Sequence, residues 1–307
     1  KVFKELNVNL KGHLQDVAAA PQFDLSLAVD PFSPRKVFAA LGMPFPVTTA
    51  DAAALNRVGL KSKIQGGTQQ VRLADGLLEL DESKLNFSAT AKDFSKPDLT
   101  FDVNLDKINL DRYLPPPSEK GATEPKKDQP AAAKKTDYTP LRKLVLDGKV
   151  RVGTLTAKGM TIQDINLTVT GRNGVIQMDP LLANLYKGTV SAKAAVDVRQ
   201  DAPRSNLTLQ TKSVQAGPLL QDFLKKDFLE GAANVEATLS MVGDAPERIK
   251  KSLNGKGQIV FANGAIKGID LAGMVRNVTS SFGLAQQGAE KPRTDFSELN
   301  APFTITD

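Results

Sequence analysis

Hydrophobic and polar residues alternate most clearly between residues 85 and 106, in two runs separated by the short segment Ser95–Asp98. The apolar positions of the two runs are Leu85, Phe87, Ala89 and Ala91, then Leu99, Phe101, Val103 and Leu105. Alternation with a period of two places each apolar set on one face of a strand. Because the separating segment contains a proline, the runs predict an antiparallel hairpin with one apolar and one polar face.

Similar alternation recurs in the second half of the chain. Its clearest apolar positions are Ile165, Leu167, Val169, Val190, Val196, Val235 and Leu239. Between the strand-like runs we expect short amphipathic helices near residues 33–41, 109–114, 217–224 and 269–278. The first has a clear start, because Ser33 can cap a helix that begins with Pro34. The pattern therefore predicts a mainly β fold with a few short helices.

Residues 115–138 interrupt this pattern. Their sequence, PPPSEKGATEPKKDQPAAAKKTDY, contains almost no large apolar residue. Such a composition cannot bury enough surface to offset the ordering of the chain, so it predicts a flexible linker or long loop. It would join an N-terminal β segment, residues 1–114, to a C-terminal β segment with short helices, residues 139–279. The last residues, 280–307, are expected to form a mobile tail.

The composition excludes most catalytic chemistry. The chain has no cysteine, which rules out disulfides and thiolate chemistry, and His13 is its single histidine. We interpret His13 as an exposed strand residue rather than a general base. Asp102, Asn104 and Asp106 share a strand face but lack the glycine and terminal glutamate of a calcium-binding loop, so they predict a solvated surface. No enzymatic activity, metal or cofactor is expected.

Charge and hydropathy limit the partners. The net charge of +6 is dispersed, and the chain has three tyrosines and no tryptophan, so nucleic acid is not an expected partner. The basic balance is compatible with an anionic lipid surface. No apolar run reaches the roughly 18–20 residues that span a bilayer.

The alternating strands leave one question open, namely what covers their apolar side. A sheet with one apolar face must bury it against another layer or a ligand. One possibility is a second sheet, which would make a β-sandwich with a closed core. The other is an apolar ligand in an open groove.

Three segments carry a family resemblance: LDESKLNFSATAKDFSKPDLTFDVNLDKINLDRYLPP, DPLLANLYKGTVSAKAAVDVRQDAPRSNLTLQTKSVQAGPLLQDFL and GKGQIVFANGAIKGIDL. Together with the residues between them, they resemble the AsmA family of bacterial envelope proteins over roughly residues 76–271. The resemblance implies an elongated, curved, mostly antiparallel β-sheet that forms a hydrophobic groove. It also implies a periplasmic body anchored to the inner membrane through an N-terminal segment absent here.

The same resemblance implies binding of phospholipid or another acyl lipid, with a role in lipid transport and outer-membrane homeostasis. The candidate lining residues of the lipid groove are Leu85, Phe87, Leu99, Phe101, Val103, Leu105, Ile165, Leu167, Val169, Val190, Val196, Val235 and Leu239. The alternative function is a structural or protein-interaction module of β-sandwich type in envelope assembly.

Overall fold

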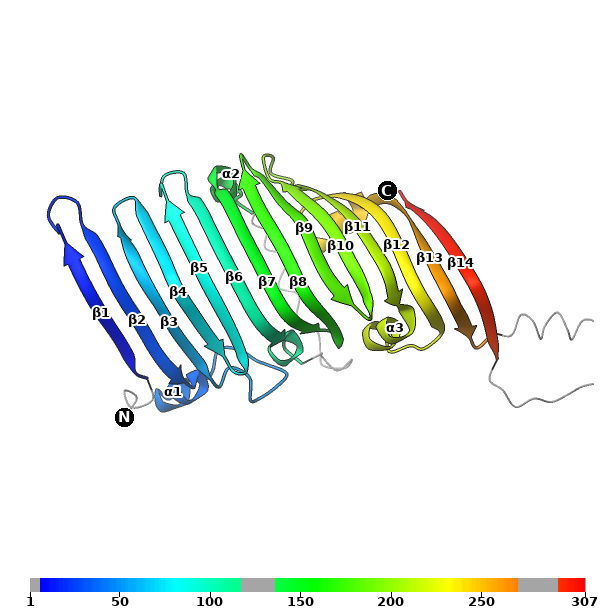
Figure 1. The fold of residues 1–307 in the computed structure, drawn as a ribbon, viewed down its shortest axis with the longest axis horizontal. Coiled ribbons are helices and arrows are strands. Elements are labelled where there is room, and N and C mark those ends of the chain that lie inside the picture. Colours follow the sequence, from blue (N-terminus) through cyan, green and yellow to red (C-terminus); the bar gives the residue numbers. More distant parts are fainter. Residues whose placement is uncertain (1–5, 117–135, 270–291, 307) are drawn as a thin grey trace, which may run out of the picture.

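The computed structural model describes residues 6–116, 136–269 and 292–306. Over these ranges the chain forms one sheet of fourteen strands, and the strands lie side by side in their sequence order (Figure 1). The strands are β1 (Val8–Gln15), β2 (Gln22–Phe32), β3 (Val58–Gly67), β4 (Gln70–Leu80), β5 (Ser83–Lys92), β6 (Asp98–Asn109), β7 (Val145–Ala157), β8 (Met160–Arg172), β9 (Val175–Leu185), β10 (Gly188–Asp197), β11 (Arg204–Gln215), β12 (Leu229–Val242), β13 (Asn254–Lys267) and β14 (Arg293–Ile305). The mainly β fold is thus confirmed as a single, curved, open sheet.

The hairpin predicted between residues 85 and 106 is confirmed as β5 and β6. Leu85 lies opposite Leu105, and Phe87 lies opposite Val103. The chain turns at Asp93, whose carboxylate accepts hydrogen bonds from Ser95. Paired residues of neighbouring strands point to the same side of a sheet, so the apolar sets of both strands share one face.

One neighbouring pair differs from the rest, because β6 and β7 run parallel while the other pairs are antiparallel. Leu99 lies opposite Leu146 in this pair. Parallel neighbours need a long crossover connection rather than a tight turn. The predicted linker lies in that connection, and its residues 117–135 are outside the described ranges. Both β segments expected from the sequence therefore belong to one continuous sheet.

The helical elements are short and lie at the ends of the strands (Figure 1). They are α1 (Pro34–Ala40), the 3-10 helix η2 (Leu110–Arg112), α2 (Thr139–Lys143), α3 (Ala216–Leu224) and α4 (Pro246–Ser252). The predicted cap is confirmed, since the Ser33 hydroxyl accepts a hydrogen bond of 3.3 Å from the Lys36 amide. The helix expected at 269–278 lies almost wholly outside the described residues.

Irregular residues within the strands bend the sheet. Asp75, Asp164, Ser213 and Asn263 have positive φ values between 50° and 55°. Aspartate and asparagine tolerate this left-handed conformation better than most residues. Register shifts accompany all four of these residues, in β4, β8, β11 and β13. Such bulges increase the local twist and bend the strand, which explains the curvature of the sheet.

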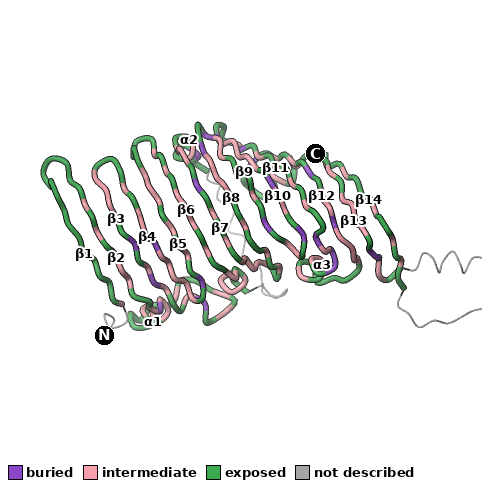
Figure 2. The backbone as a smooth tube through the Cα atoms, in the orientation of Figure 1, coloured by how far each residue is buried: buried purple, intermediate pink, exposed green. Residues whose placement is uncertain are grey.

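The sheet has no packed core of the usual kind. The buried apolar residues are mostly alanines, and Val198 is the largest fully buried side chain among the described residues. Exposure alternates along the strands, as in β5, and buried residues are scattered (Figure 2). The described residues contain no second sheet. The β-sandwich alternative is therefore wrong, because both halves of the chain extend one layer instead of stacking as two.

Two boundaries predicted from the sequence need correction. Residues 293–305, expected within a mobile tail, form the edge strand β14. Its apolar residues Leu299 and Phe303 lie opposite Phe261 and Gly257 of β13, and this pairing orders the segment. At the end of the predicted linker, Tyr138 is 8% exposed, and its hydroxyl donates a hydrogen bond of 2.8 Å to Asp244. The ordered chain thus resumes before residue 139.

Candidate functional site

The candidate site is the apolar face of the sheet, which is built from rows of paired residues. One row runs through Leu78, Leu85, Leu105, Val152 and Ile165. The next runs through Gly76, Phe87, Val103, Val150, Leu167 and Leu181. A third runs through Leu73, Ala89, Phe101, Gly148, Val169 and Met178. Five or six successive strands thus contribute an apolar residue or glycine to each row.

The apolar face continues to both edges of the sheet. Toward β14 one row passes through Ala192, Leu209, Ala237, Gly257 and Phe303. Toward β1 another passes through Val71, Gly66, Phe23 and Leu14. None of the residues in these five rows is charged. The face therefore crosses all fourteen strands without a charged interruption in these rows.

Two polar side chains on the apolar face, those of Ser62 and Thr211, are bonded to the backbone. The Ser62 hydroxyl donates to the Ala74 carbonyl at 3.2 Å. The Thr211 hydroxyl accepts a hydrogen bond of 2.9 Å from the amide of Val235. These groups are thereby satisfied within the protein. The face offers hydrocarbon contact rather than directional polar contacts.

Register and burial show where the predicted groove residues lie. All thirteen are on the apolar face, and all are half-buried rather than enclosed. They come from β5 and β6 (Leu85, Phe87, Leu99, Phe101, Val103, Leu105), β8 (Ile165, Leu167, Val169), β10 (Val190, Val196) and β12 (Val235, Leu239). The structure brings them onto one surface; a role in lipid contact stays a prediction.

Several residues of the same face were absent from the prediction. They include Leu146 and Val150 of β7, Met178 of β9 and Phe303 of β14. The alternation of β7 was visible in the sequence. In β9, Asp179 and Pro180 interrupt the alternation where the pairing with β10 shifts register, so its apolar face could not be followed. In β14 the alternation Leu299, Ala301, Phe303 and Ile305 was the overlooked signal.

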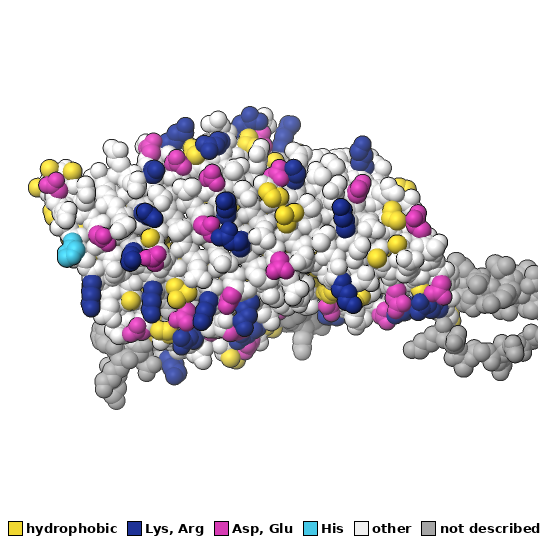
Figure 3. Space-filling model, in the orientation of Figure 1, with side chains coloured by type: hydrophobic (Ala, Val, Ile, Leu, Met, Phe, Trp, Pro, Cys, Tyr) yellow, Lys and Arg dark blue, Asp and Glu magenta, His cyan; other side chains and the backbone are white. Residues whose placement is uncertain are grey.

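The opposite face is polar and charged. Figure 3 shows this side, marked by His13, with positive and negative side chains spread over the strands. Arg151 of β7 pairs with Asp102 of β6 at 2.6 Å, and both side chains are nearly half exposed. Exposed pairs of this kind contribute little stability. The described residues contain no group of three or more potential metal-binding side chains.

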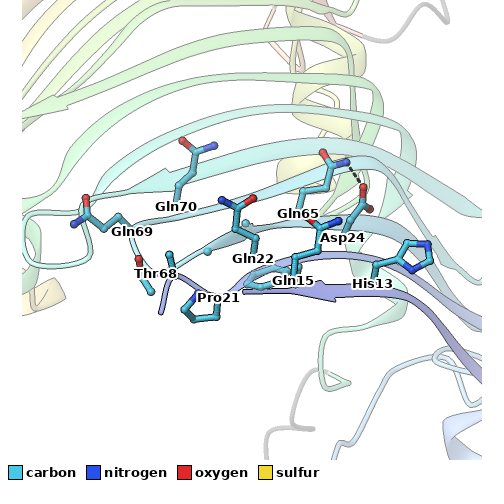
Figure 4. A pocket seen from close by; sticks show the side chains of 13 residues that line it. His13, Gln15, Pro21, Gln22, Asp24, Gln65, Thr68, Gln69 and Gln70 are labelled. Atoms are coloured by element: carbon cyan, nitrogen blue, oxygen red, sulfur yellow. Dashed lines mark hydrogen bonds between the residues drawn. The ribbon is translucent and has the colours of Figure 1, made fainter. Parts of the chain in front are cut away.

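A hollow with a volume of about 580 Å³ lies on the polar face near the turns that join β1 to β2 and β3 to β4. Gln22, Asp24 and Gln65 project to the same side of it, and Gln65 donates a hydrogen bond of 2.9 Å to Asp24 (Figure 4). His13 lines the same hollow. The hollow is thus an open, amide-rich surface, separate from the apolar face.

Several titratable groups with shifted pKa values lie at the ends of the strands. Burial of the Asp81 carboxyl favours a higher pKa, but hydrogen bonds from the backbone amides of Leu55 and Asn56 outweigh it, so the pKa is lowered. Burial, together with a hydrogen bond to Asp222, raises the pKa of Tyr186 to about 12. These groups anchor loops and helices to the sheet and do not lie on the apolar face.

Arg112 and Tyr113 form the structural corner that follows β6. Arg112 pairs with Asp51 at 2.6 Å and also with Glu82. Tyr113 donates a hydrogen bond to Asp81. The corner therefore binds two separate loops at the same end of the sheet, which explains the polar residues that follow the β5–β6 hairpin.

No described helix is long and apolar enough to cross a membrane. The fold and the candidate site define a class of protein: a single curved β-sheet whose one face is a broad apolar surface left uncovered by the described residues.

Comparison with known proteins places the chain within a family. The AsmA family matches residues 35–307, so the chain belongs to the AsmA family, as its sequence segments indicated. Protein AsmA of Escherichia coli (strain K12) is 20% identical over 225 residues, which cover 69% of this chain and 36% of that protein. The chain thus spans about a third of the length of this curated relative. No solved structure gave a significant match. Family membership points to a protein associated with the bacterial envelope.

Proposed function

We propose that the chain binds the acyl chains of phospholipid, or of another acyl lipid, along its apolar face and thereby contributes to lipid transport between the membranes of the bacterial envelope. The observation that carries this proposal is the continuity of the apolar face across fourteen strands with no covering layer in the described residues. A sheet normally buries such a face against a second layer. A large exposed apolar surface marks an interaction site.

The chemistry of the face suits hydrocarbon chains. Each methylene group removed from water gains about 0.8 kcal/mol. Because Ser62 and Thr211 are already bonded to the backbone, a bound acyl chain would meet aliphatic and aromatic side chains along its length. A charged head group costs several kcal/mol to bury without a partner, so it would stay at the margin of the sheet. Binding of this kind needs no catalytic residue.

The dimensions also suit lipid. At about 4.8 Å between neighbouring strands, a sheet of fourteen strands is roughly 60 Å wide. The hydrocarbon of one membrane leaflet is about 15 Å deep, half of a bilayer core. Several acyl chains would therefore fit end to end across the strands of the sheet. A row of successive sites of equal polarity would let a lipid move along the face without crossing a large energy barrier.

The proposed location is the periplasm, with anchorage to the inner membrane through a segment outside this sequence. Membership of the AsmA family supports this location. The polar face, with exposed pairs such as Arg151–Asp102, would face water.

The proposal is tested by extracting and identifying lipid from protein purified from bacterial cells, with native mass spectrometry of the intact complex. Leu167→Lys places a charge on the apolar face, and Thr168→Lys places the same charge on the polar face one residue away. We expect phospholipid in the wild type and in Thr168→Lys, and a strong loss in Leu167→Lys. Absence of lipid in the wild type, together with no lipid crosslink from a photoreactive residue at Phe101 or Leu167 in cells, would overturn the proposal.

A further inference from the structure

Large apolar side chains lie directly over glycines of the neighbouring strand at several places on the apolar face. Phenylalanine and glycine are opposite each other in five pairs of the described strands: Phe23–Gly66, Phe87–Gly76, Phe101–Gly148, Phe303–Gly257 and Phe296–Gly264. A Cβ atom added to Gly76 or Gly257 would lie 2.5 Å from atoms of the paired ring, and one added to Gly148 would overlap the ring of Phe101. At Gly76 and Gly148 the rings therefore occupy the space that a side chain would take, whereas at Gly66 and Gly257 backbone carbonyl oxygens, of Gln70 and Glu236, lie closer still.

Backbone conformation does not explain these glycines. Gly66, Gly76, Gly148 and Gly257 are not among the residues with positive φ, so their backbone is accessible to other residues. Glycine in a strand lowers stability, because it loses more conformational freedom and has no side chain to pack. What is particular to Gly76 and Gly148 is that the ring alone lies where the side chain would be. Gly76 and Gly148 are in fact buried on a face whose other residues are mostly half-exposed.

The rings of the central hairpin lean away from each other. Phe87 of β5 covers Gly76 of β4, and Phe101 of β6 covers Gly148 of β7. Between them, the facing positions of β5 and β6 include Ala89 and Val103, which are small or medium in size. Side chains on a strand usually stand roughly perpendicular to the sheet. Here two bulky rings are instead laid sideways over neighbouring strands.

We propose that these phenylalanine–glycine pairs hold the phenylalanine rings close to the backbone of the sheet, so that an acyl chain can lie across the sheet above the rings. This inference rests on the proposed function. It identifies residues that determine how thick a ligand the apolar face can accept. A ring lying flat on glycine adds only about 3.5–4.0 Å, the contact distance between carbon atoms, whereas an upright ring would project its full length into the space of the ligand. The glycines thus act as positioning residues for the rings.

A purely structural role predicts something different. An aromatic ring over a strand glycine stabilises the sheet by covering exposed backbone. If that were the whole role, removal of the ring would be the damaging change, and the height of the ring would not affect ligand binding. The two roles are separated by variants that raise the ring and variants that remove it.

The experiment measures binding of the fluorescent fatty acid parinaric acid to purified wild type, Gly148→Ala, Phe101→Ala and the double variant. Gly148→Ala forces the ring of Phe101 off the strand. Affinity is expected to fall by about fourfold for each methylene group of the ligand that loses its contact with the face. The double variant should bind like Phe101→Ala alone, because no ring remains to be raised. Circular dichroism and thermal unfolding confirm that each variant retains its sheet.

Two results would overturn the inference while leaving the proposed function intact: folded Gly148→Ala that binds parinaric acid as the wild type does, or a double variant as weak as Gly148→Ala. A wild type that binds no parinaric acid and carries no lipid would instead remove the proposed function, and the inference with it. If Gly148→Ala does not fold, Gly76→Ala with Phe87→Ala repeats the comparison between β4 and β5, where the added Cβ atom again meets the phenylalanine ring.

Discussion

The hydroxyl of Tyr113 donates a hydrogen bond of 2.9 Å to the carboxylate of Asp81, which lies in the turn between β4 and β5. The same carboxylate accepts hydrogen bonds from the backbone amides of Leu55, Asn56 and Arg57, at 2.8, 2.9 and 3.0 Å. One side chain thus holds the loop before β3, the turn after β4 and the corner after β6. A single-layer sheet has little core to stabilise it, so polar contacts at its ends gain importance.

Removing the Tyr113 hydroxyl should weaken this end of the sheet. Tyr113→Phe deletes the donor and leaves Asp81 with its backbone partners, so we expect a loss of about 1 kcal/mol in the free energy of unfolding. Urea denaturation followed by circular dichroism measures it. The control is Thr168→Val, on the polar face of β8, which should change stability by less than about 0.5 kcal/mol. Equal effects of the two substitutions would contradict the role given to Tyr113.

Asp81 should make stability depend on pH in the acid range. Its pKa is lowered in the folded state, because hydrogen bonds from the backbone and Tyr113 outweigh its burial. A lowered pKa means that its stabilisation is present above the unfolded-state value, near 3.9, and is lost as the pH falls through the folded-state value. The wild type should therefore exceed Asp81→Asn in stability at pH 7, and the difference should shrink by pH 3. A constant difference in urea midpoint across this range would disprove the assignment.

The cap of α1 supplies a separate measure of local stability. Ser33 is 8% exposed. Its hydroxyl accepts a hydrogen bond from the backbone amide of Lys36 and donates one to the side-chain oxygen of Asn56. Ser33→Ala should cost about 1 kcal/mol, a typical value for losing an N-cap. Ser26→Ala on the exposed side of β2 is the matched control and should be nearly neutral. Thermal unfolding of both variants measures the difference. Equal stability of Ser33→Ala and Ser26→Ala would contradict the capping role of Ser33.

The two faces of the sheet should differ in access to reagents when lipid is bound. The chain has no cysteine, so a single introduced cysteine is an unambiguous probe. Ala194 lies opposite Met178 and Leu207 on the apolar face, while the neighbouring Ala195 projects from the polar face. With lipid present, a charged thiol reagent should label Ala195→Cys faster than Ala194→Cys. Delipidation should narrow the difference; equal rates before and after it would contradict the proposed location of the ligand.

The edge strand β14 should be visible in hydrogen exchange. Residues 293–305 pair with β13 along most of their length, from Lys267–Arg293 to Gly255–Ile305. Amides that point toward β13 should exchange slowly, and those that point away should exchange quickly, since no strand is paired with β14 on its other side in the described residues. Nuclear magnetic resonance resolves the alternation. Uniformly fast exchange over this segment would indicate that it does not form a strand.

Local features of the fold were predictable because their causes lie close together in the sequence. The alternation from Leu85 to Leu105 and the turn near Pro97 define a hairpin without reference to the rest of the chain. Ser33 followed by Pro34 likewise defines the start of α1. Within each strand, the predicted groove residues share one face because a strand repeats every two residues, whatever its neighbours are. That these faces coincide in different strands follows from the pairing. Their contact with lipid remains a prediction.

Other features depended on contacts that no local pattern reveals. The edge strand β14 was missed because its segment, from Arg293 to Ile305, becomes ordered by pairing with β13. The position of Gly148 under Phe101 follows from a parallel register between strands that are separated by the crossover. The corner at Tyr113 likewise depends on Asp81, 32 residues away in the sequence.

By itself, the sequence determined that this protein would be made of two-faced strands, since the period of a strand is a property of the backbone. Only the tertiary structure decided that the strands form one layer, with β6 parallel to β7 and an apolar face that the described residues leave uncovered. The reason is that one and the same alternating pattern satisfies a sandwich and an open sheet equally well. The choice between them depends on which strands pair across the crossover, and that pairing is a long-range property of the whole chain.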